Sequence, residues 1–423
     1  MKIGIIGAGI SGLSAGRLLA GTFEVEILEK EPHIGGIAWV KMVGNIPYHT
    51  VGGHCLNSNN ARIMNFIFET VLAPEQWHRV QRIAKIALDN HLIDYPIEFS
   101  VPQIATYDED LAYRMTYDFL TSDEQRPTAT LEDWFRVKFG NTLAEKYFIP
   151  YNSKIWNMPP AAMSPAWVEG KLPIPDRKHF FKSLISKQKD SMPHAHFYYP
   201  NANTQNQFIA ALANGLDIKT NYTVDSIEHD GQEWVINGEK RYDAIINTMP
   251  LNMLPSILAN APEQVLHAAS LLKYNKVTNM LWETDDVEAT WTYFPEASTP
   301  FHRHIHIGNF TNPCTNHTIT EVIGAKTIQQ MTDAGSSIGY LKQPVDYNVS
   351  DHAYVVFDHN YSECVEKIKK YLESIGLHTL GRFGEWQYYN MDICMESAII
   401  VVENIIRKTS GKLIRPNTCS LQE

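Results

Sequence analysis

The order of apolar and polar residues at the start of the chain predicts a strand, a helix and a second strand. Residues Lys2–Gly7 form a short apolar run that is typical of a buried parallel strand. Apolar residues then recur at helical spacing between residues 10 and 19, and a second run covers Glu24–Leu28. Because parallel strands are joined by crossover helices, this β-α-β order predicts an α/β domain with a parallel sheet.

Further along the chain, helical and strand patterns occur in longer blocks. An aromatic-rich region at about 100–190 has helical spacing and indicates an inserted helical domain, whereas residues of about 270–355 indicate a second sheet. The Asn237-Gly238 pair after an apolar run predicts a hairpin. Other expected elements are helices at about 60–73, 206–216, 363–375 and 392–407, and strands at 196–199, 218–227 and 242–250.

The first strand leads into Gly7-Ala-Gly9-Ile-Ser-Gly12, which has the spacing of a dinucleotide-binding turn. Gly7 permits the tight turn, Gly9 lets the backbone approach a pyrophosphate, and Gly12 lets helix and strand pack closely. The helix N-terminus then offers its N–H groups to the phosphates. Glu29 ends the second strand, about where a carboxylate accepts hydrogen bonds from an adenosine ribose. The chain is therefore predicted to bind a dinucleotide.

A second glycine-rich turn, Gly35-Gly36, follows just beyond this acid. It resembles the extension in FAD proteins of the glutathione-reductase-like class, where it accommodates the flavin half. A third turn, Gly52-Gly53-His54, has glycines that allow the backbone to pass close against a flat ring. We therefore predict FAD as the cofactor and His54 near the flavin; the alternative for His54 is a surface-loop histidine.

These patterns predict an α/β fold in which a Rossmann-like FAD-binding domain carries two further domains. Because the strand and helix patterns alternate along the chain, the domains are expected to be discontinuous. The FAD-binding domain is assigned to residues 1–100, 206–265 and 376–423, the helical insert to 101–190, and the antiparallel β-sheet domain to 191–205 and 266–375.

Composition supports an ordinary globular protein and limits its partners. With 423 residues, 44% hydrophobic and 20% charged, the chain does not have the composition of a disordered, collagenous or coiled-coil protein. Lys and Arg total 36 against 47 Asp and Glu, so the formal charge of −11 disfavours nucleic acid and anionic membranes as partners.

Cysteine usage and the N-terminal pattern bear on location. The five cysteines are odd in number and form no C-x-x-C pair, so neither a disulfide framework nor a zinc site is signalled. The first strand follows Met1 at once, and no run of 18 apolar residues occurs. We expect a cytoplasmic protein without a membrane span.

Four segments together resemble the UDP-galactopyranose mutases and related FAD proteins. They are the glycine turns at 35–36 and 52–54, Tyr147–Trp156, Thr292–Arg303 and Gly381–Asp392, so the likeness spans most of the chain. The resemblance implies that reduced FAD is a nucleophile toward a nucleotide sugar. N5 attacks the anomeric carbon, UDP leaves, the ring opens through an iminium, and reclosure on another oxygen gives the furanose without net redox change.

The resemblance implies a set of catalytic residues besides His54. Arg303 is the candidate clamp for the departing diphosphate, because its planar fork meets phosphate oxygens bidentately. A second arginine of the family is replaced by Lys171, which neutralises phosphate only as a point charge; Arg177 is the alternative. Tyr354 and Tyr388 match tyrosines that contact phosphate, although Val355 replaces the proline that follows the first in the family.

The same resemblance assigns the remaining ligand contacts. Tyr151 and Trp156 correspond to aromatics that pack against uridine, with Asn152 between them, although a hydrophobic core is the alternative for both rings. The turn before the last helix is expected at the flavin pyrophosphate or ring edge. The cofactor-binding candidates are Gly7, Gly9, Gly12, Glu29, Lys30, Gly35, Gly36, Gly53, Val224, Arg382, Asn390, Met391 and Asp392.

The chain also departs from the family. A glycine-rich turn of the relatives is absent at Tyr198–Asn206, which, together with Lys171, indicates a divergent member and leaves the identity of the sugar open. His302, His304 and His306 alternate along one strand, where a polar sheet face is favoured over a metal site. We assign no metal ligand.

Three functions remain to be separated. The first is a flavin-dependent pyranose–furanose mutase, an isomerase of glycan biosynthesis that acts on a nucleotide sugar. The second is an FAD-dependent oxidoreductase of the amine-oxidase or protoporphyrinogen-oxidase type, because fold does not settle chemistry. The third is a flavin protein without catalysis that binds glycans or a partner. A reductant such as NAD(P)H is compatible with the mutase, and the sequence leaves the oligomeric state open.

Overall fold

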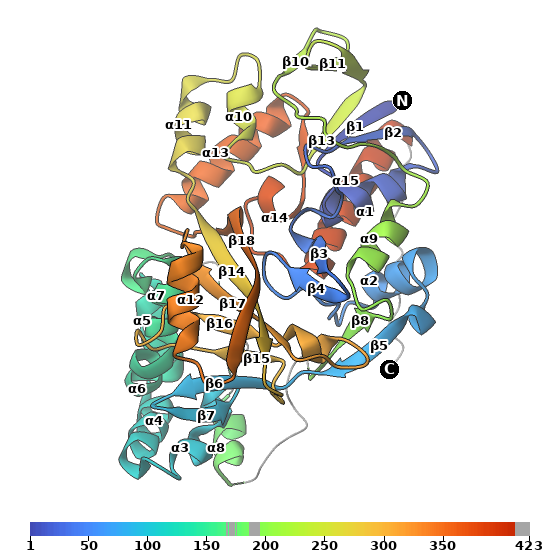
Figure 1. Cartoon of the computed structure of the whole chain (residues 1–423). Coiled ribbons are helices and arrows are strands. Elements are labelled where there is room, and N and C mark those ends of the chain that lie inside the picture. Colours follow the sequence, from blue (N-terminus) through green and yellow to red (C-terminus); the bar gives the residue numbers. More distant parts are fainter. Residues whose placement is uncertain (166–167, 169–173, 175, 186–194, 411–423) are drawn as a thin grey trace, which may run out of the picture. The chain divides into compact units, whose positions relative to one another are not determined.

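The computed structural model describes residues 1–165, 168, 174, 176–185 and 195–410 and divides into two compact units (Figure 1). The first unit comprises Met1–Gly36, Leu212–Pro262 and Lys369–Glu423, and the second comprises Ile37–Ala211 and Glu263–Ile368. None of the helices in the described ranges combines the length and the apolar character that a bilayer crossing needs.

The first unit is built on a parallel sheet of five strands in the order β19-β13-β1-β2-β9. The predicted β-α-β start of this sheet is confirmed as β1 (Lys2–Ile6), α1 (Ile10–Leu19) and β2 (Glu24–Leu28). Gly16 lets α1 lie close to the sheet, because a Cβ there would be 2.8 Å from a methyl carbon of Ile27. The other strands are β9 (Asp217–Lys219), β13 (Ala244–Asn247) and β19 (His378–Thr379).

The same unit carries a small antiparallel sheet and several helices. The predicted hairpin is confirmed: β11 (Trp234–Ile236) and β12 (Lys240–Tyr242) pair around Asn237 and Gly238, which have φ angles of 51° and 70°. β10 (Ile227–His229) pairs with β11 on the other side. The long helix α15 (Met391–Ser410) packs against α1, and the short helices are α10 (Leu254–Ile257) and α14 (Gly381–Gly384).

The second unit is built on a sheet of seven strands in the order β18-β14-β17-β16-β15-β6-β7. Its neighbouring strands are antiparallel except for β15 and β6, which run parallel. The large ring of Trp282 is buried in one core, and Gly335 of α12 (Ile328–Ser336) lies directly on it. The strands are β6 (Ala84–Leu88), β7 (His91–Asp94), β14 (Tyr274–Thr284), β15 (Trp291–Tyr293), β16 (Arg303–Ile305), β17 (His317–Ile323) and β18 (Leu341–Val355).

Helices between residues 101 and 185 form the aromatic-rich part that the sequence predicts. Phe148 stacks on Phe139 at 3.9 Å and on Phe135 at 5.3 Å between ring centroids, and all three rings are buried. Asn275 of β14 donates a hydrogen bond to the backbone oxygen of Trp156 at 2.7 Å, which ties these helices to the seven-stranded sheet. The helices are α3 (Val101–Ile104), α4 (Glu109–Thr121), α5 (Leu131–Phe139), α6 (Asn141–Leu143), α7 (Ile149–Trp156) and α8 (Arg177–Ile185).

Shorter elements complete the chain. Two antiparallel pairs lie in the second unit, β3 with β4 and β5 with β8. The elements are α2 (Ala61–Asn65), α9 (Asn206–Ala213), α11 (Glu263–Leu271), α13 (Tyr361–Ser374), β3 (Val40–Val43), β4 (Ile46–His49), β5 (Trp77–Gln81) and β8 (His196–Pro200), with π-helical turns at Phe66–Val71 and Ala144–Phe148.

The division into two units differs from the boundaries that the sequence analysis assigned. Residues 37–100, placed there with the FAD-binding domain, cluster with the seven-stranded sheet, as does the helical region. The physical reason is strand pairing across long separations: β6 pairs with β15 and β5 with β8. Such pairings depend on partners about 120 to 200 residues away, which local periodicity does not reveal.

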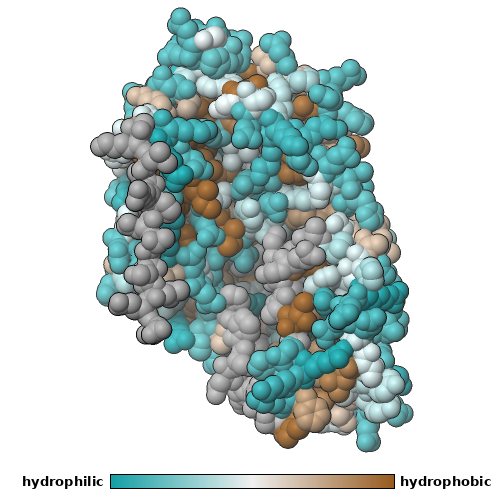
Figure 2. Space-filling model, turned by 180° about the vertical axis from the view of Figure 1, so that it is seen from behind, coloured by the Kyte–Doolittle hydropathy of each residue, from teal (hydrophilic) through white to brown (hydrophobic). Residues whose placement is uncertain are grey.

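The surface agrees with the acidic composition. In Figure 2 hydrophilic residues cover most of the face shown, with scattered apolar ones between them. Isolated exposed apolar side chains of this kind are normal for a folded chain.

Candidate functional site

The glycine turn after β1 has the geometry that its spacing predicts. A Cβ on Gly12 would lie 1.9 Å from the backbone oxygen of Gly7, so helix α1 could not approach the turn with any side chain there. Gly7 has a φ of 98°, and a Cβ on it would lie 2.3 Å from Oγ1 of Thr248. At Gly9 a Cβ would lie 3.8 Å from the Cα of Gly36, and no other atom of the described chain beyond its sequence neighbours would come within 4 Å, so this side of the turn is open.

The N-terminus of α1 suits a phosphate. Gly9 is the N-cap, no side chain within the described ranges caps the helix, and its first turn has no acidic residue. The first N–H groups of a helix lack intrahelical partners and carry partial positive charge. Because the backbone here is both open and donor-rich, the turn fits the pyrophosphate of a dinucleotide.

Glu29 supports this turn directly. Its buried carboxylate accepts hydrogen bonds from the backbone nitrogens of Ala8 at 2.7 Å and Glu31 at 2.9 Å. Each carboxylate oxygen can accept more than one hydrogen bond, so these contacts leave acceptor capacity for a ribose hydroxyl. Glu29 therefore has a structural role that the sequence analysis did not include.

The second glycine turn lies against the first. The backbone nitrogen of Gly35 donates to the oxygen of Ala8 at 2.8 Å, and a Cβ on Gly36 would be 3.1 Å from the Cα of Gly9. Gly35 and Gly36 have φ angles of 109° and 56°, in the region that favours glycine. The turns that the sequence analysis identified separately thus form one cradle of backbone.

The start of the C-terminal helices also reaches this cradle. A Cβ on Gly381 would lie 2.1 Å from Oγ of Ser11, in the first turn of α1. The Arg382 guanidinium lies 4.5 Å from the centre of the Tyr388 ring and donates to the oxygen of Tyr389 at 3.2 Å. The structure thus brings Arg382 and Tyr388 together within the first unit.

The other cofactor candidates of this unit differ in exposure. Met391 and Val224 are buried, Asp392 is half-buried, and Asn390 is exposed at the start of α15. Lys30 is exposed and pairs with Glu31 at 3.5 Å.

In the second unit, the turn at 52–54 is held by a buried acid on β17. The backbone nitrogen of Gly52 donates to Oε1 of Glu321 at 2.7 Å, and the Glu321 side chain is fully buried. A Cβ on Gly53 would lie 2.9 Å from a methyl carbon of Ile305, so this glycine is required by close packing.

Arg303 shares the same acid. Its Nε donates to Oε2 of Glu321, and its Nη2 donates to the hydroxyl of Tyr354 at 2.7 Å. A Cβ on Gly52 would be 3.0 Å from Nη2, so turn and guanidinium are in close contact. The Arg303 side chain is 15% exposed, whereas Glu321 is 0% exposed. The structure thereby brings together three predicted elements: Arg303, Tyr354 and the turn that precedes His54.

The histidine beside Arg303 does not add charge to this cluster. His302 is buried, with Nε2 3.6 Å from Oε2 of Glu321. Burial, followed by the positive charge of Arg303, holds the pKa of His302 well below its usual value. The ion pair of Arg303 with Glu321 therefore dominates the electrostatics here.

The other two histidines of this strand bond to hydroxyl groups. His304 contacts the hydroxyl of Tyr340 at 2.6 Å, and His306 contacts Thr292 at 3.0 Å and Thr318 at 2.9 Å. Within the described ranges, no three or more His, Cys, Asp or Glu side chains are grouped to hold a metal.

The aromatic segment around α7 is mostly internal. Trp156 is 2% exposed, its indole nitrogen donates to Oδ1 of Asn152 at 3.0 Å, and its ring meets that of Tyr354 edge-on at 6.3 Å. Tyr151 is partly exposed and stacks on Tyr147 at 5.5 Å. Of the predicted uridine contacts, Tyr151 is thus the more accessible residue, while Trp156 packs against Tyr354.

The structure gives little support to either candidate for the second diphosphate cation, Lys171 or Arg177. Lys171 lies outside the described residues. Arg177 is tied to the segment after α4, where it pairs with Glu124 at 3.2 Å and donates to the oxygen of Ser122. A different cation, Lys154 of α7, is half-buried and donates to the backbone oxygens of Phe294, Glu296 and Phe301, which fixes the segment leading into Arg303. Burial lowers the pKa of Lys154 to about 8.

Both parts of the chain resemble known proteins. Residues 5–69 match the family model of an NAD(P)-binding Rossmann-like domain. The chain is 23% identical to UDP-galactopyranose mutase from Mycoplasma genitalium, over 92% of this chain and 90% of that protein. The crystal structure of a reduced UDP-galactopyranose mutase matches with a TM-score of 0.84 and 21% identity, covering 97% of this chain and 94% of that one.

The predicted resemblance to the UDP-galactopyranose mutases is confirmed. The predicted α/β fold class is confirmed as well. A structure from Exiguobacterium, provisionally named a protoporphyrinogen oxidase, matches with a TM-score of 0.73 and 14% identity over 96% of this chain and 99% of that one. The Rossmann-like domain and these neighbours imply a dinucleotide cofactor.

Glu321 is the residue of this mutase-like chain that sequence reasoning missed most clearly. Replacing it with glutamine keeps the shape but removes the charge that pairs with Arg303, and it leaves one acceptor oxygen where Gly52 and Arg303 now use two. We expect the free energy of unfolding to fall by about 3 kcal/mol, because the largely buried Arg303 side chain loses its anionic partner. Urea unfolding followed by tryptophan fluorescence measures this.

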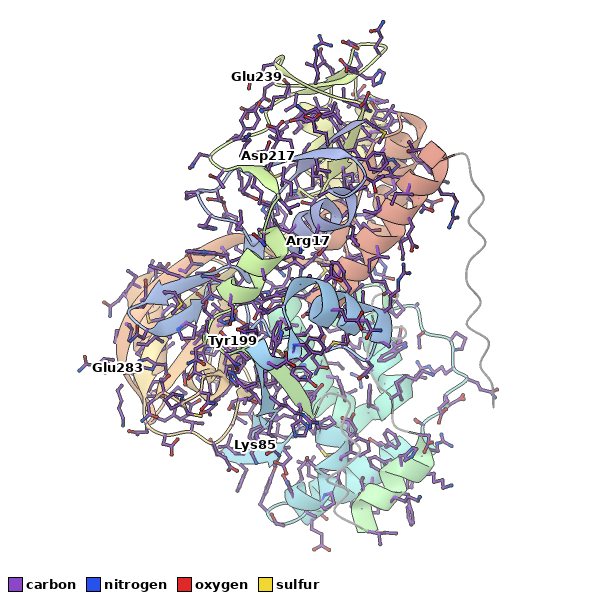
Figure 3. The ribbon with its side chains drawn as sticks, turned by 90° about the vertical axis from the view of Figure 1, so that its right-hand side faces the viewer. Arg17, Lys85, Tyr199, Asp217, Glu239 and Glu283 are labelled. Atoms are coloured by element: carbon purple, nitrogen blue, oxygen red, sulfur yellow. The ribbon has the colours of Figure 1, made fainter. Side chains whose placement is uncertain are left out.

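The matched control is Glu283→Gln, an exposed acid of β14 that points outward in Figure 3. This control is expected to change stability by less than about 0.5 kcal/mol. Equal urea midpoints for the two variants would contradict a supporting role of Glu321.

Proposed function

We propose that this chain is an FAD-dependent pyranose–furanose mutase acting on a nucleotide sugar of the UDP-galactopyranose kind. The observation that carries the proposal is the cluster of Arg303, Tyr354 and Glu321 beside the glycine turn at 52–54. The Glu321 carboxylate is fully buried and the Arg303 side chain is 15% exposed, so of this pair the arginine is the member that a ligand can reach. A leaving diphosphate needs such a fixed cation.

The protein groups then have separate tasks. Arg303 neutralises the departing diphosphate, and Tyr354 orients the guanidinium through Nη2. The backbone of the glycine cradle and the N-terminus of α1 bind the cofactor pyrophosphate, while Glu29 fixes the turn. When bound, reduced FAD supplies a nucleophilic nitrogen, N5, for the anomeric carbon, as the resemblance implies.

The residues of the first unit fit this cofactor. The backbone is open at Gly9, and the second glycine turn packs against it. Two adjacent turns of this kind fit a dinucleotide better than a mononucleotide. The assignments of His54, Lys171, Tyr388, Tyr151 and the C-terminal cofactor residues remain proposals from the resemblance, as do a reductant such as NAD(P)H and a cytoplasmic location.

An FAD-dependent oxidoreductase is the second candidate function. Its support is the fold similarity to the Exiguobacterium structure over 96% of this chain. Hydride removal from a substrate without diphosphate has no use for a fixed, partly exposed arginine. The Arg303 cluster therefore favours the mutase.

One assay separates the two functions. Purified protein is mixed with UDP-sugars before and after dithionite reduction, the products are resolved by chromatography, and oxygen uptake is recorded in parallel. The mutase is expected to convert pyranose to furanose only with reduced flavin and without oxygen uptake. Turnover by the oxidised protein with peroxide release would support the oxidoreductase and contradict the mutase.

A further inference from the structure

His49, at the end of β4, makes two hydrogen bonds that together define its protonation. Its ring is 0% exposed. The backbone nitrogen of His54 lies 3.1 Å from Nδ1, and because a backbone N–H can only donate, Nδ1 must be the unprotonated acceptor. Nε2 then carries the proton and donates it to the hydroxyl of Tyr199, 2.8 Å away.

The imidazole rings of His49 and His54 also stack on each other. His49 and His54 lie nearly parallel, with 6.0 Å between ring centroids and an interplanar angle of 10°. Tyr199 of β8, labelled in Figure 3, and Phe310 pack around His49, with centroids 6.0 Å and 6.5 Å from its own. One side chain thus contacts both the backbone and the ring of His54.

The segment that carries His49 is itself fixed to the seven-stranded sheet. Asn279 of β14 donates to the backbone oxygen of His49 at 3.1 Å, and its Oδ1 accepts from the hydroxyl of Tyr48 at 2.6 Å. The turn at 50–54 is therefore held just before its start, by Asn279 at His49, and at its middle, by Glu321 at Gly52.

Packing alone does not explain an imidazole at this place. Burying a polar ring is unfavourable unless both nitrogens are satisfied, and a phenyl ring would fill the space without that requirement. Burial lowers the pKa of His49 to about 3, which agrees with a neutral ring. The two matched partners, one of them the backbone of His54, indicate a role in orientation.

We infer that His49, as the neutral Nε2–H tautomer, is a positioning residue that sets the backbone and ring orientation of the candidate catalytic residue His54. The inference rests on the proposed mutase function for its kinetic consequence. It acts through another residue, so it is expected to affect turnover more than substrate binding.

The first test is nuclear magnetic resonance of histidine nitrogens in the full-length flavin-loaded protein at neutral pH, with His49→Asn used to assign the signals. Of the two ring nitrogens of His49, we expect Nδ1 to show the chemical shift of an unprotonated, pyridine-like nitrogen and Nε2 that of a protonated, pyrrole-like nitrogen. A protonated Nδ1 would overturn the inference. This readout does not depend on mutase turnover.

The second test compares three variants for kcat and KM with a UDP-sugar and reduced flavin. His49→Phe keeps a ring but loses the acceptor, and is expected to lower kcat by about 10- to 100-fold with KM within about twofold. His49→Asn retains an oxygen acceptor near the position of Nδ1 and is expected to recover most of that loss. Phe310→Leu is the packing control, expected to leave kcat within about threefold.

The ranking of these variants decides between orientation and packing. If His49→Asn is no better than His49→Phe, or if Phe310→Leu loses as much turnover as His49→Phe, packing explains the site and the inference is wrong. If the wild-type protein converts no nucleotide sugar, the proposed function fails, and the nitrogen shifts alone decide whether His49 bonds to His54 as described.

Discussion

Arg303→Ala is expected to lower mutase turnover with reduced flavin by about 100- to 1000-fold, the range seen when one fixed donor to a developing anion is removed. It should also weaken binding of UDP by about 1.5–3 kcal/mol, because a charge-assisted contact to the diphosphate is lost. The structural reason is the fixed orientation of the guanidinium by Glu321 and Tyr354. Steady-state kinetics and calorimetric titration with UDP measure both effects.

Two further variants show whether the effect depends on the geometry of the guanidinium and on its position. Arg303→Lys keeps the charge without the fork, so we expect it to retain part of the UDP affinity but little turnover. Arg241→Ala removes an exposed arginine of the first unit and is expected to change neither value. Wild-type affinity for UDP in Arg303→Ala would remove this residue from the substrate site.

Gly12→Ala is expected to yield protein that is largely colourless, with flavin affinity reduced by about 100-fold or more. The added Cβ would lie 1.9 Å from the oxygen of Gly7, so α1 or the turn must move. Both supply the N–H groups proposed to bind the pyrophosphate, so a shift of this size removes several contacts at once. The flavin-to-protein absorbance ratio and titration of the apoprotein with FAD measure the loss.

The control for this variant is Gly21→Ala. Among the described residues other than its chain neighbours, none places a heavy atom within 4 Å of a Cβ on Gly21, so wild-type flavin content is expected. Full flavin occupancy in Gly12→Ala, with unchanged affinity, would contradict the assignment of this turn to the cofactor.

The nucleotide-binding part could be predicted from the sequence because its signal is local. The strand, glycine spacing, helix and terminal acid all fall between residues 2 and 29, and the structure places them as the spacing requires. The backbone contacts of Glu29 could not be predicted, since a carboxylate at the end of a strand fits a ligand or its own turn equally well.

The Arg303 cluster shows where sequence reasoning ends. Arg303 and Tyr354 could be named through the resemblance, but Glu321 lies in an ordinary strand sequence with no motif around it. Its role depends on the pairing of β16 with β17, which places residue 321 opposite residue 303. No periodicity within either strand reports that register.

The aromatic segment shows a similar limit. Tyr151 and Trp156 have the same chemical character in the sequence, and the alternatives of ligand contact and core applied to both. In the structure Trp156 is 2% exposed and donates a hydrogen bond to Asn152, whereas Tyr151 is partly exposed. The difference arises from tertiary packing, which the sequence pattern alone does not reveal.

The single carboxylate that holds both the Gly52 amide and the Arg303 guanidinium has an evolutionary consequence. A relative that replaces the arginine would be left with an unpaired buried anion, and one that replaces the acid would release the turn as well. Substitutions at positions 52, 303 and 321 should therefore arise jointly across related chains, and a lineage that changes its leaving group would be expected to alter all three.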